Sequence, residues 1–273
     1  MRPTLRARRS LGQHFLRDDN IARKIASAVA PAPGDLILEI GPGEGALTRH
    51  LTGRGARLLL AEIDERAVEV LRAAFPGDDA EVLHGDVLAL DLTREAAARQ
   101  TRLRVAGNIP YNITTPILFH LVDHRAAVRD ATLMMQKEVA VRIAAPPGGK
   151  QYGILSVLTQ LYADVRVLFD VSRNAFVPKP DVTSTVLRLS FLPGPRYPVA
   201  DEAFARAMVR AVFGQRRKTL RNSLRAFLER SGVGLPETPA LTRRPEELSV
   251  REFTELANLL LAGGRRPSST SVS

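Results

Sequence analysis

Hydrophobic and polar positions follow two alternating patterns through the first half of the chain. Short apolar runs of four to six residues are typical of strands buried in a sheet, and amphipathic stretches with helical spacing lie between them. Strands that alternate with helices predict a parallel sheet with helices on both faces. The predicted strands are 36–40, 57–62, 81–84, 103–107 and 132–136, and the predicted helices are 21–30, 45–52, 64–75 and 116–121.

The pattern changes after residue 136 and again after residue 201. Helical stretches at 137–144 and 153–162 precede strand-like stretches at 165–169 and 183–191, and only helical patterns follow residue 201. A segment rich in proline and glycine, 193–198, is typical of a linker. We therefore predict two domains and a polar tail. They are an α/β domain over 1–195, with 1–10 flexible, a smaller all-helical C-terminal domain over 196–263, and a disordered tail over 264–273.

Composition narrows the classes of site and partner. The chain has no cysteine, which excludes disulfides, thiolate zinc sites and a cysteine nucleophile. The formal net charge is +10, and residues 1–24 and 201–273 each carry a basic excess of five. A neutral middle with two basic flanks is typical of a protein that holds a polyanion beside a central site. Because 34 of the 39 basic residues are arginine, genomic base composition is an alternative explanation.

The sequence predicts a cytoplasmic protein without a membrane partner. No apolar run approaches the roughly 18 residues that span a bilayer. The N-terminus is basic but no apolar segment follows it, so it does not resemble a secretory signal. A transit peptide also fits this composition and stays an open alternative. The five histidines lack the spacing of a metal site, so no metal is expected.

A glycine-rich turn follows the first predicted strand directly. Residues 39–45 read Glu-Ile-Gly-Pro-Gly-Glu-Gly and open a predicted helix. Glycines let the backbone bend sharply and let a ligand approach closely. Gly41, Gly43 and Ala46 also match the dinucleotide fingerprint, and a turn without any ligand could have the same sequence.

Acidic residues near the ends of the first three strands narrow the ligand class. Glu62 ends the second strand, where a carboxylate accepts hydrogen bonds from ribose hydroxyls. Asp86 follows the third strand, where it could accept from an adenine amino group. These acids favour S-adenosylmethionine over NAD, because Glu39 and Glu44 at the turn would repel a pyrophosphate. Helix capping is the alternative role for such residues.

Four residues after the fourth strand, Asn108-Ile-Pro-Tyr111, form a stiff turn because Pro110 restricts its own backbone and that of Ile109. The turn presents a carboxamide oxygen, a backbone carbonyl and an aromatic ring together. These groups suit methylation of an exocyclic amine: the oxygens hold the N–H groups while Tyr111 stacks on the base. No strong base is required. A loop with Tyr111 packed in the core is the alternative.

Phe176 precedes two prolines in a segment predicted to be extended and rigid. A ring that projects from such a loop could stack on an extruded base, with core packing as the alternative.

Further along, the segment from Gln215 to Arg225 is basic and amphipathic. Its row of Arg217, Arg221 and Arg225 at four-residue spacing predicts phosphate contacts, although a solvated helix face has the same pattern.

Seven segments in order from residue 12 to residue 223 resemble the ribosomal RNA adenine N6,N6-dimethyltransferase family. They read GQHFL at 12–16, EIGPG at 39–43, GNIPYN at 107–112, QKE at 136–138, YG at 152–153, FVPKPDVTS at 176–184 and QRRKTLRNS at 215–223. The resemblance implies a Rossmann-like class I methyltransferase domain with S-adenosyl-L-methionine as cofactor. It also implies dimethylation of two adjacent adenosines in the 3′-terminal hairpin of 16S rRNA, by a monomer acting on the 30S subunit or its precursor during ribosome biogenesis.

The resemblance also implies roles for individual residues. It assigns cofactor binding to His14, Leu16, Gly41, Gly43, Glu62, Ile63, Asp86, Val87 and Asn108. It assigns catalysis to Asn108, Pro110, Tyr111 and Phe176, with the two aromatic rings on either side of the target adenine. It assigns RNA binding to Arg210, Arg216, Arg217, Lys218 and Arg221. One departure is His14, where the family usually has asparagine.

Three other functions fit parts of the pattern. A macrolide-resistance methyltransferase would act on large-subunit RNA, but 215–223 and the Asn112-Ile-Thr sequence favour the small-subunit enzyme. A non-catalytic ribosome-assembly factor would need only the basic flanks. An NAD oxidoreductase would use the glycine turn for another cofactor.

Overall fold

The computed structural model describes residues 5–8, 11–77 and 79–263, and the chain divides into two compact units. Unit 1 holds Met1–Ala140 and Ala163–Gly194, and unit 2 holds Val141–Tyr162 and Pro195–Ser273. The sequence analysis places 141–162 in the larger domain. The structure assigns this segment to unit 2, because α7 (Ile154–Tyr162) packs against α8 (Glu202–Phe213). The predicted tail, 264–273, and residues 1–4 and 9–10 of the predicted flexible start lie outside the described residues.

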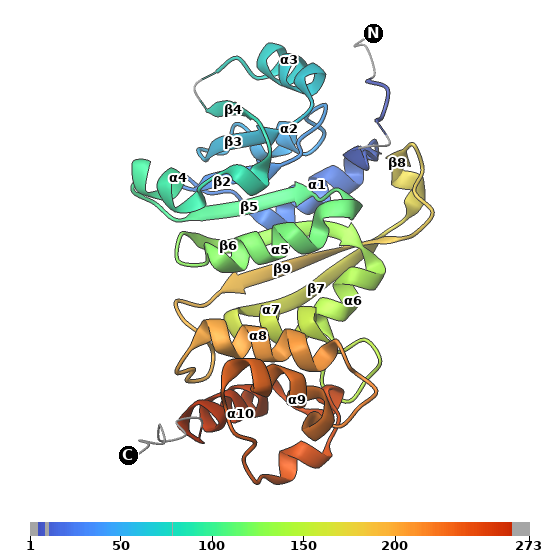
Figure 1. Ribbon diagram of the computed structural model, residues 1–273. Helices are drawn as coiled ribbons and strands as arrows, with labels where there is room; N and C mark the ends of the chain where they lie inside the picture. Colours follow the sequence, from blue (N-terminus) through green and yellow to red (C-terminus); the bar gives the residue numbers. More distant parts are fainter. Residues whose placement is uncertain (1–4, 9–10, 78, 264–273) are drawn as a thin grey trace. The chain divides into compact units, whose positions relative to one another are not determined.

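Unit 1 is built around a seven-stranded mixed sheet in the order β4-β3-β2-β5-β6-β9-β7 (Figure 1). The first five strands in this order are parallel, and β9 and β7 extend the sheet through antiparallel pairs. The five parallel strands confirm the α/β prediction. The strands are β2 Leu36–Ile40, β3 Arg57–Glu62, β4 Ala80–His84, β5 Leu103–Asn108, β6 Val128–Gln136, β7 Ala163–Val171 and β9 Ser184–Phe191.

Helices cover the sheet on both sides, with α1 behind the strands and α5 in front in Figure 1. Helix α1 starts where the Asp18 side chain accepts hydrogen bonds from two backbone N–H groups, and it ends at Ala30 in the left-handed conformation. The helices are α1 Asp19–Val29, α2 Thr48–Leu51, α3 Glu65–Ala74, α4 Leu92–Ala98 and α5 Thr114–Asp123. Helix α6, Lys137–Ala144, begins in unit 1 and continues into unit 2 from Val141. The short 3-10 helices of this unit are η2 Val87–Ala89, η3 Tyr111–Ile113 and η4 Arg173–Ala175.

Two predictions for these helices need correction. The helix predicted over 45–52 is reduced to the four residues of α2, because the glycine turn continues through Gly45, whose φ is 78°. Helix α4 was not predicted from the sequence. It begins at a cap formed by Asp91, whose side chain accepts from the backbone N–H groups of Thr93 and Arg94.

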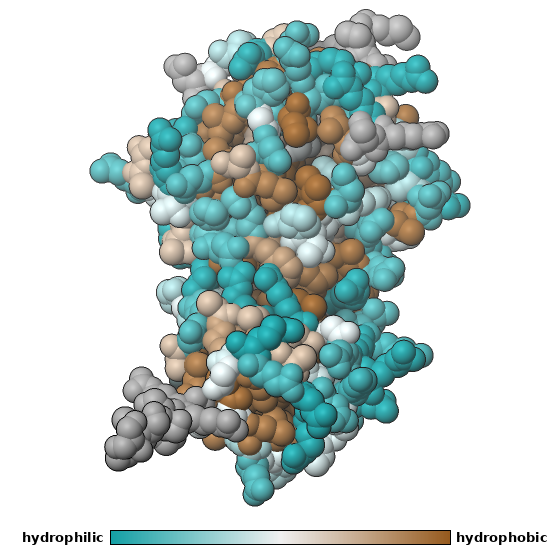
Figure 2. Space-filling view, viewed as in Figure 1, coloured by the Kyte–Doolittle hydropathy of each residue, from teal (hydrophilic) through white to brown (hydrophobic). Residues whose placement is uncertain are grey.

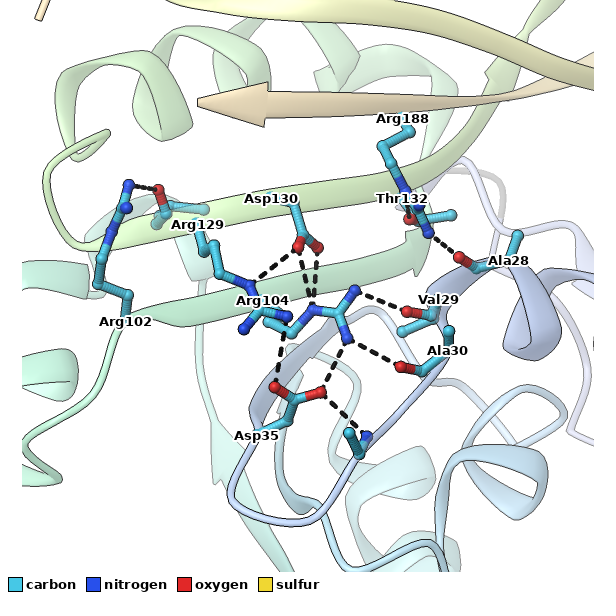
Figure 3. Close-up of polar contacts among 12 residues, drawn as sticks. Ala28, Val29, Ala30, Asp35, Arg102, Arg104, Arg129, Asp130, Thr132 and Arg188 are labelled. Carbon is cyan, nitrogen blue, oxygen red and sulfur yellow. Dashed lines mark hydrogen bonds and ion pairs between the residues drawn. The ribbon is translucent and has the colours of Figure 1, made fainter. Parts of the chain in front are cut away.

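A buried ionic cluster joins α1 to the sheet at the amino-terminal ends of the parallel strands (Figure 3). Arg104, whose side chain is 6% exposed, donates to both carboxylate oxygens of Asp130 at 3.1 Å and to Asp35 at 2.8 Å. It also donates to the carbonyl oxygens of Val29 and Ala30, at 2.6 and 3.0 Å. These carbonyls end a helix and have no partner within it. One guanidinium therefore satisfies two carboxylates and a helix terminus.

A second, two-stranded sheet joins the start of unit 1 to its end. Strand β1 (Phe15–Leu16) pairs antiparallel with β8 (Phe176–Val177), so that Phe15 lies opposite Val177 and Leu16 opposite Phe176. Because side chains alternate along a strand, the two pairs face opposite sides. Leu16 and Phe176 are buried in the main core, and Val177 is 56% exposed.

Unit 2 is helical in all the secondary structure that the structure describes for it. Its α8 is followed by α9 (Leu220–Ser231) and α10 (Val250–Gly263), with the 3-10 helices η5 (Pro239–Thr242) and η6 (Pro245–Glu247) between the last two. Buried apolar side chains from all three α-helices form its core; they include Met208, Val212, Leu224, Phe227, Phe253 and Leu260. No helix within the described residues is long and apolar enough to cross a bilayer. Hydrophilic side chains dominate the visible surface in Figure 2.

Candidate functional site

The carboxyl-terminal ends of the parallel strands in unit 1 border a cavity of about 1080 Å³, open solvent at its mouth included. Eleven of the residues predicted to bind cofactor or to act in catalysis line it together. They are His14, Leu16, Gly41, Gly43, Glu62, Ile63, Asp86, Val87, Asn108, Pro110 and Tyr111.

The glycine turn forms the floor of this cavity. Gly41 and Gly43 have φ angles of 62° and 57°, in the left-handed region that favours glycine. A Cβ atom on Gly43 would lie 3.1 Å from the ring of Phe15, which reaches the turn from β1. The turn is therefore held by backbone conformation and by the first strand. Gly41 N donates to the Ala61 carbonyl oxygen at 2.9 Å, and Gly43 N donates to the Glu62 carboxylate at 2.9 Å.

Glu62 anchors the turn and the segment after β3 at once. One carboxylate oxygen accepts from Gly43 N at 2.9 Å, and the other accepts from Ile63 N and Asp64 N at 3.0 and 2.9 Å. Burial raises the pKa of Glu62, and the three backbone hydrogen bonds oppose that shift. A carboxylate has about four acceptor sites, so one remains for a hydroxyl donor in the cavity.

Glu39 is a second buried acid beside the cavity. Burial, together with the nearby charge of Glu62, raises the pKa of Glu39 to about 8, although a 2.7 Å hydrogen bond from the Thr48 hydroxyl lowers it. At neutral pH the Glu39 carboxyl therefore holds its proton.

We expect this proton to make stability depend on pH. The unfolded chain loses it near pH 4.5, whereas the folded chain keeps it until about pH 8, so stability falls as pH rises between these values. The slope is about 1.4 kcal/mol per pH unit. Glu39→Gln, which keeps an acceptor for Thr48, should remove about 2–3 kcal/mol of this dependence over two pH units in urea unfolding. The exposed Glu69→Gln is the control, and equal pH slopes in the wild type and the Glu39 variant would contradict the assignment.

Asp86 combines the two roles that the sequence left as alternatives. Its carboxylate accepts from Leu88 N at 2.9 Å and caps η2, while the residue also lines the cavity. The second carboxylate oxygen is available to a ligand. Ile63, which is 49% exposed, adds an apolar surface to the same cavity.

The turn from Asn108 to Tyr111 forms another wall. The Asn108 Nδ2 atom donates to the carbonyl oxygen of His14 at 2.9 Å, which leaves the carboxamide oxygen free to accept. The Tyr111 hydroxyl is 2.7 Å from Ser184 Oγ, and the His14 ring stacks on Tyr111 with centroids 5.4 Å apart. The other side of His14 contacts the loop after β8, where its Nδ1 lies 2.8 Å from Pro178 O.

The predicted role of Phe176 needs correction. The side chain is 2% exposed and lies in the main hydrophobic core, and it does not line the cavity. Its pairing opposite the buried Leu16 fixes this direction. The alternative of core packing therefore describes the structure, and the exposed residue of this strand is Val177.

Sequence reasoning missed several residues that hold the site. Ser184, fully buried on β9, fixes Tyr111, and Gln13 donates to Asp64 beside Glu62. Glu44 accepts from Leu5 N and pairs with Arg17, both at 2.5 Å, which holds the start of the chain near the cavity. The quoted motifs contain all three side chains or adjoin them, but their partners are distant in sequence, so no local pattern reveals the pairs.

The predicted RNA-binding residues lie in unit 2 and differ in their contacts. Arg216 is used within the unit: it donates to the carbonyl oxygens of Gly149 and Lys150 and lies 3.6 Å from Glu246. Arg217, Lys218 and Arg221 are exposed, and so is Arg210. The structure thus gives Arg216 a structural contact that the sequence did not predict.

Comparisons with known proteins cover nearly the whole chain. Residues 4–260 match the family described as Ribosomal RNA adenine dimethylase. The Aromatoleum aromaticum protein named Ribosomal RNA small subunit methyltransferase A is 44% identical over 96% of this chain and 97% of its own length. The protein of the same name from Geobacter metallireducens is 46% identical over 95% and 98%.

Solved structures agree with this similarity. A dimethyladenosine transferase from Plasmodium falciparum superposes with a TM-score of 0.73 at 25% identity, over 92% of this chain and 98% of its own. The 23S rRNA methyltransferase ErmE superposes with a TM-score of 0.65 at 28% identity, over 90% and 99%. Both matches cover nearly the full length of the compared chains.

Proposed function

The chain belongs to the ribosomal RNA adenine dimethylase family, and from this premise we propose its substrate and the roles of its residues. Family membership makes it a methyltransferase that dimethylates adenine in ribosomal RNA. The proposed target is the N6 atom of two adjacent adenosines in the 3′-terminal hairpin of 16S rRNA, within the 30S subunit or its precursor. The proposed cofactor is S-adenosyl-L-methionine.

One observation carries the proposal: the acidic residues and the Asn108–Tyr111 turn share a single cavity. Glu62 and Asp86 each keep an acceptor site for ribose hydroxyls and an adenine amino group, and Ile63 offers an apolar surface to the ring. Glu39, which holds its proton at neutral pH, does not add the repulsion of a pyrophosphate that the sequence predicted, but Glu44 and Asp86 also line the cavity. A cavity lined by these acids suits a cationic ligand better than a pyrophosphate. When bound, S-adenosylmethionine supplies a methyl group on a positively charged sulfur.

The chain's own residues then orient the target amine. The free oxygen of Asn108 and a backbone carbonyl of the same turn accept the two N–H groups, which directs the nitrogen lone pair toward the methyl group. Tyr111, fixed by Ser184, provides the ring on which the base stacks, on the face that His14 does not cover. The nitrogen loses its proton after attack, so no side chain acts as a strong base. A second transfer at the same nitrogen requires the pocket to admit a monomethylated base.

A large-subunit substrate is the second candidate, and one comparison bears on it. The 23S rRNA methyltransferase ErmE is 28% identical to this chain, whereas proteins named for small-subunit methylation reach 46%. Similarity therefore favours the small subunit.

Hydrolysis of the methylated RNA to nucleosides tests the proposed chemistry. N6,N6-dimethyladenosine is the expected product, and a reaction that stops at N6-methyladenosine would contradict the proposed dimethylation.

Glu62→Gln should weaken binding of S-adenosylmethionine by about tenfold or more, because an amide offers only one acceptor oxygen and carries no charge. Isothermal titration calorimetry measures the affinity directly. Thermal unfolding of the variant checks that the glycine turn, which Glu62 also holds, stays folded. An affinity equal to that of the wild type would remove Glu62 from the cofactor site.

Replacing Arg217 and Arg221 with alanine should weaken RNA binding and lower its dependence on salt. Each lost phosphate contact reduces the slope of log affinity against log salt by about one, so the double variant should lose about two. A double variant at Arg230 and Arg251 removes the same charge from unit 2 and is the control. Equal slopes in the two double variants would show that Arg217 and Arg221 lie on ordinary solvated surface.

A further inference from the structure

An open hollow lies beside the proposed target site in unit 1. Its walls are Leu5, Arg6 and Ala7 from the start of the chain, and Val177 and Pro178 from the loop after β8. The cavity described above does not include these residues. The hollow is thus a separate concave surface.

The exposed apolar side of this hollow follows from the pairing of β1 with β8. Phe176 and Leu16 take the buried side, so the next residue, Val177, must point outward, and it is 56% exposed. Pro178 continues this exposed apolar surface. The exposed Val177 side chain does not contribute to the core of unit 1. The flat ring of a nucleotide base can cover it.

His14 connects the hollow to the target-base wall. Its ring stacks on Tyr111 on one side, and its Nδ1 lies 2.8 Å from Pro178 O on the other. One side chain, His14, therefore contacts both the target-base wall and the loop that lines the hollow.

Two basic residues fit a phosphate backbone here: Arg6, which lines the hollow, and Lys179, which follows Pro178 in the sequence. Both are exposed, and no ion pair or hydrogen bond of either side chain is seen among the described residues. The nearby Arg8, in contrast, pairs with Asp64. Asp181 is the acid that follows Lys179 in the same loop. Two free cations beside an exposed apolar surface fit single-stranded RNA, whose bases and phosphates need both.

We propose that this hollow binds the nucleotide adjacent to the target adenosine, with its base on Val177 and Pro178 and its phosphate near Arg6 and Lys179. The inference rests on the proposed function, since it takes the RNA strand through the Asn108–Tyr111 site as given. It adds a binding site for the second of the two adjacent target adenosines. While one adenosine is in the cavity, the other lies in the hollow.

Site-specific photocrosslinking tests this placement. Val177→p-benzoylphenylalanine in the full-length chain is irradiated with unmethylated small subunits, and the crosslinked nucleotide is mapped by reverse-transcription stops. Val167, 49% exposed on β7, receives the same substitution as the matched control. We expect position 177 to crosslink at or next to the methylated adenosines, and position 167 to give no such product. Equal crosslinking from both positions, or mapping to a distant nucleotide, would overturn the proposal.

Kinetics test the phosphate contact separately. Arg6→Ala with Lys179→Ala should lower kcat/KM for RNA by roughly tenfold, with an unchanged KM for S-adenosylmethionine. Arg54→Ala with Arg57→Ala, which removes exposed charges at the amino-terminal end of β3, is the control and should lose less than twofold. Equal losses of kcat/KM in the two double variants would show that Arg6 and Lys179 do not contact the RNA phosphate. Methyl transfer by the wild type on the same particles distinguishes failure of the proposed function from failure of this inference. If the wild type transfers no methyl group, the proposed function is wrong. If it transfers methyl groups but position 177 does not crosslink, only the proposed role of the hollow is wrong.

Discussion

Asn108→Ala is expected to reduce methyl transfer about a thousandfold while RNA binding stays within about twofold of the wild type. The reason is geometric: the Asn108 amide nitrogen donates to His14 O, which leaves its oxygen to accept from the target amine in the proposed mechanism. Alanine removes the acceptor that orients the nitrogen lone pair, and it also releases the segment around His14. Single-turnover methyl transfer under saturating RNA isolates this effect from binding.

Asn20→Ala is the control for this experiment. Asn20 lies on the surface of α1, where it accepts from the exposed Arg23, and its replacement should leave transfer unchanged. Turnover of the Asn108 variant within tenfold of the wild type would show that the carboxamide oxygen does not position the amine.

Arg104→Ala is expected to destabilise the chain by about 3–5 kcal/mol, since it leaves two largely buried carboxylates with the half-exposed Arg129 as their remaining ionic partner in this cluster. Asp35 and Asp130 would face each other, and the last carbonyls of α1 would lose their donor, as Figure 3 shows. The polar groups in this cluster are satisfied together, so the loss of one guanidinium affects all of them. Urea unfolding followed by circular dichroism measures the change.

Arg129 provides a matched control within the same cluster. It pairs with the same two aspartates at 3.4 and 3.2 Å, but its side chain is 51% exposed. Solvent screens such a pair, so Arg129→Ala should cost at most about 1 kcal/mol. Similar losses for the two variants would show that burial does not determine the contribution of this cluster.

Sequence reasoning predicted the parts of the fold that local patterns encode. The strands 36–40 and 57–62 match β2 and β3 in full, because uninterrupted apolar runs between turn signals leave little choice of ends. The cavity residues were predictable for a similar reason. Carboxyl ends of parallel strands meet at one edge of a sheet, so Glu62, Asp86 and Asn108 must converge there.

Features that depend on distant partners could not be predicted from the sequence. Phe176 looks exposed in a proline-rich segment, and only its pairing opposite Leu16 determines that it points inward. Arg216 looks like part of a basic row, but a loop near residue 150 uses it as a donor. Likewise, the segment 141–162 reads as a continuation of the first domain, although its helix packs with α8 in unit 2. Neither the hydrophobic periodicity of a segment nor the spacing of its motifs shows which distant residues it contacts.

The central claim is that the cavity methylates two adjacent adenosines of small-subunit RNA. The most direct test gives the protein radiolabelled S-adenosylmethionine with unmethylated small subunits and, in parallel, with large-subunit RNA. Label that appears only on the small-subunit RNA, as N6,N6-dimethyladenosine near its 3′ end, is the result that the account predicts. Label on the large-subunit RNA, or tight binding to small subunits with no label on either RNA, would contradict it.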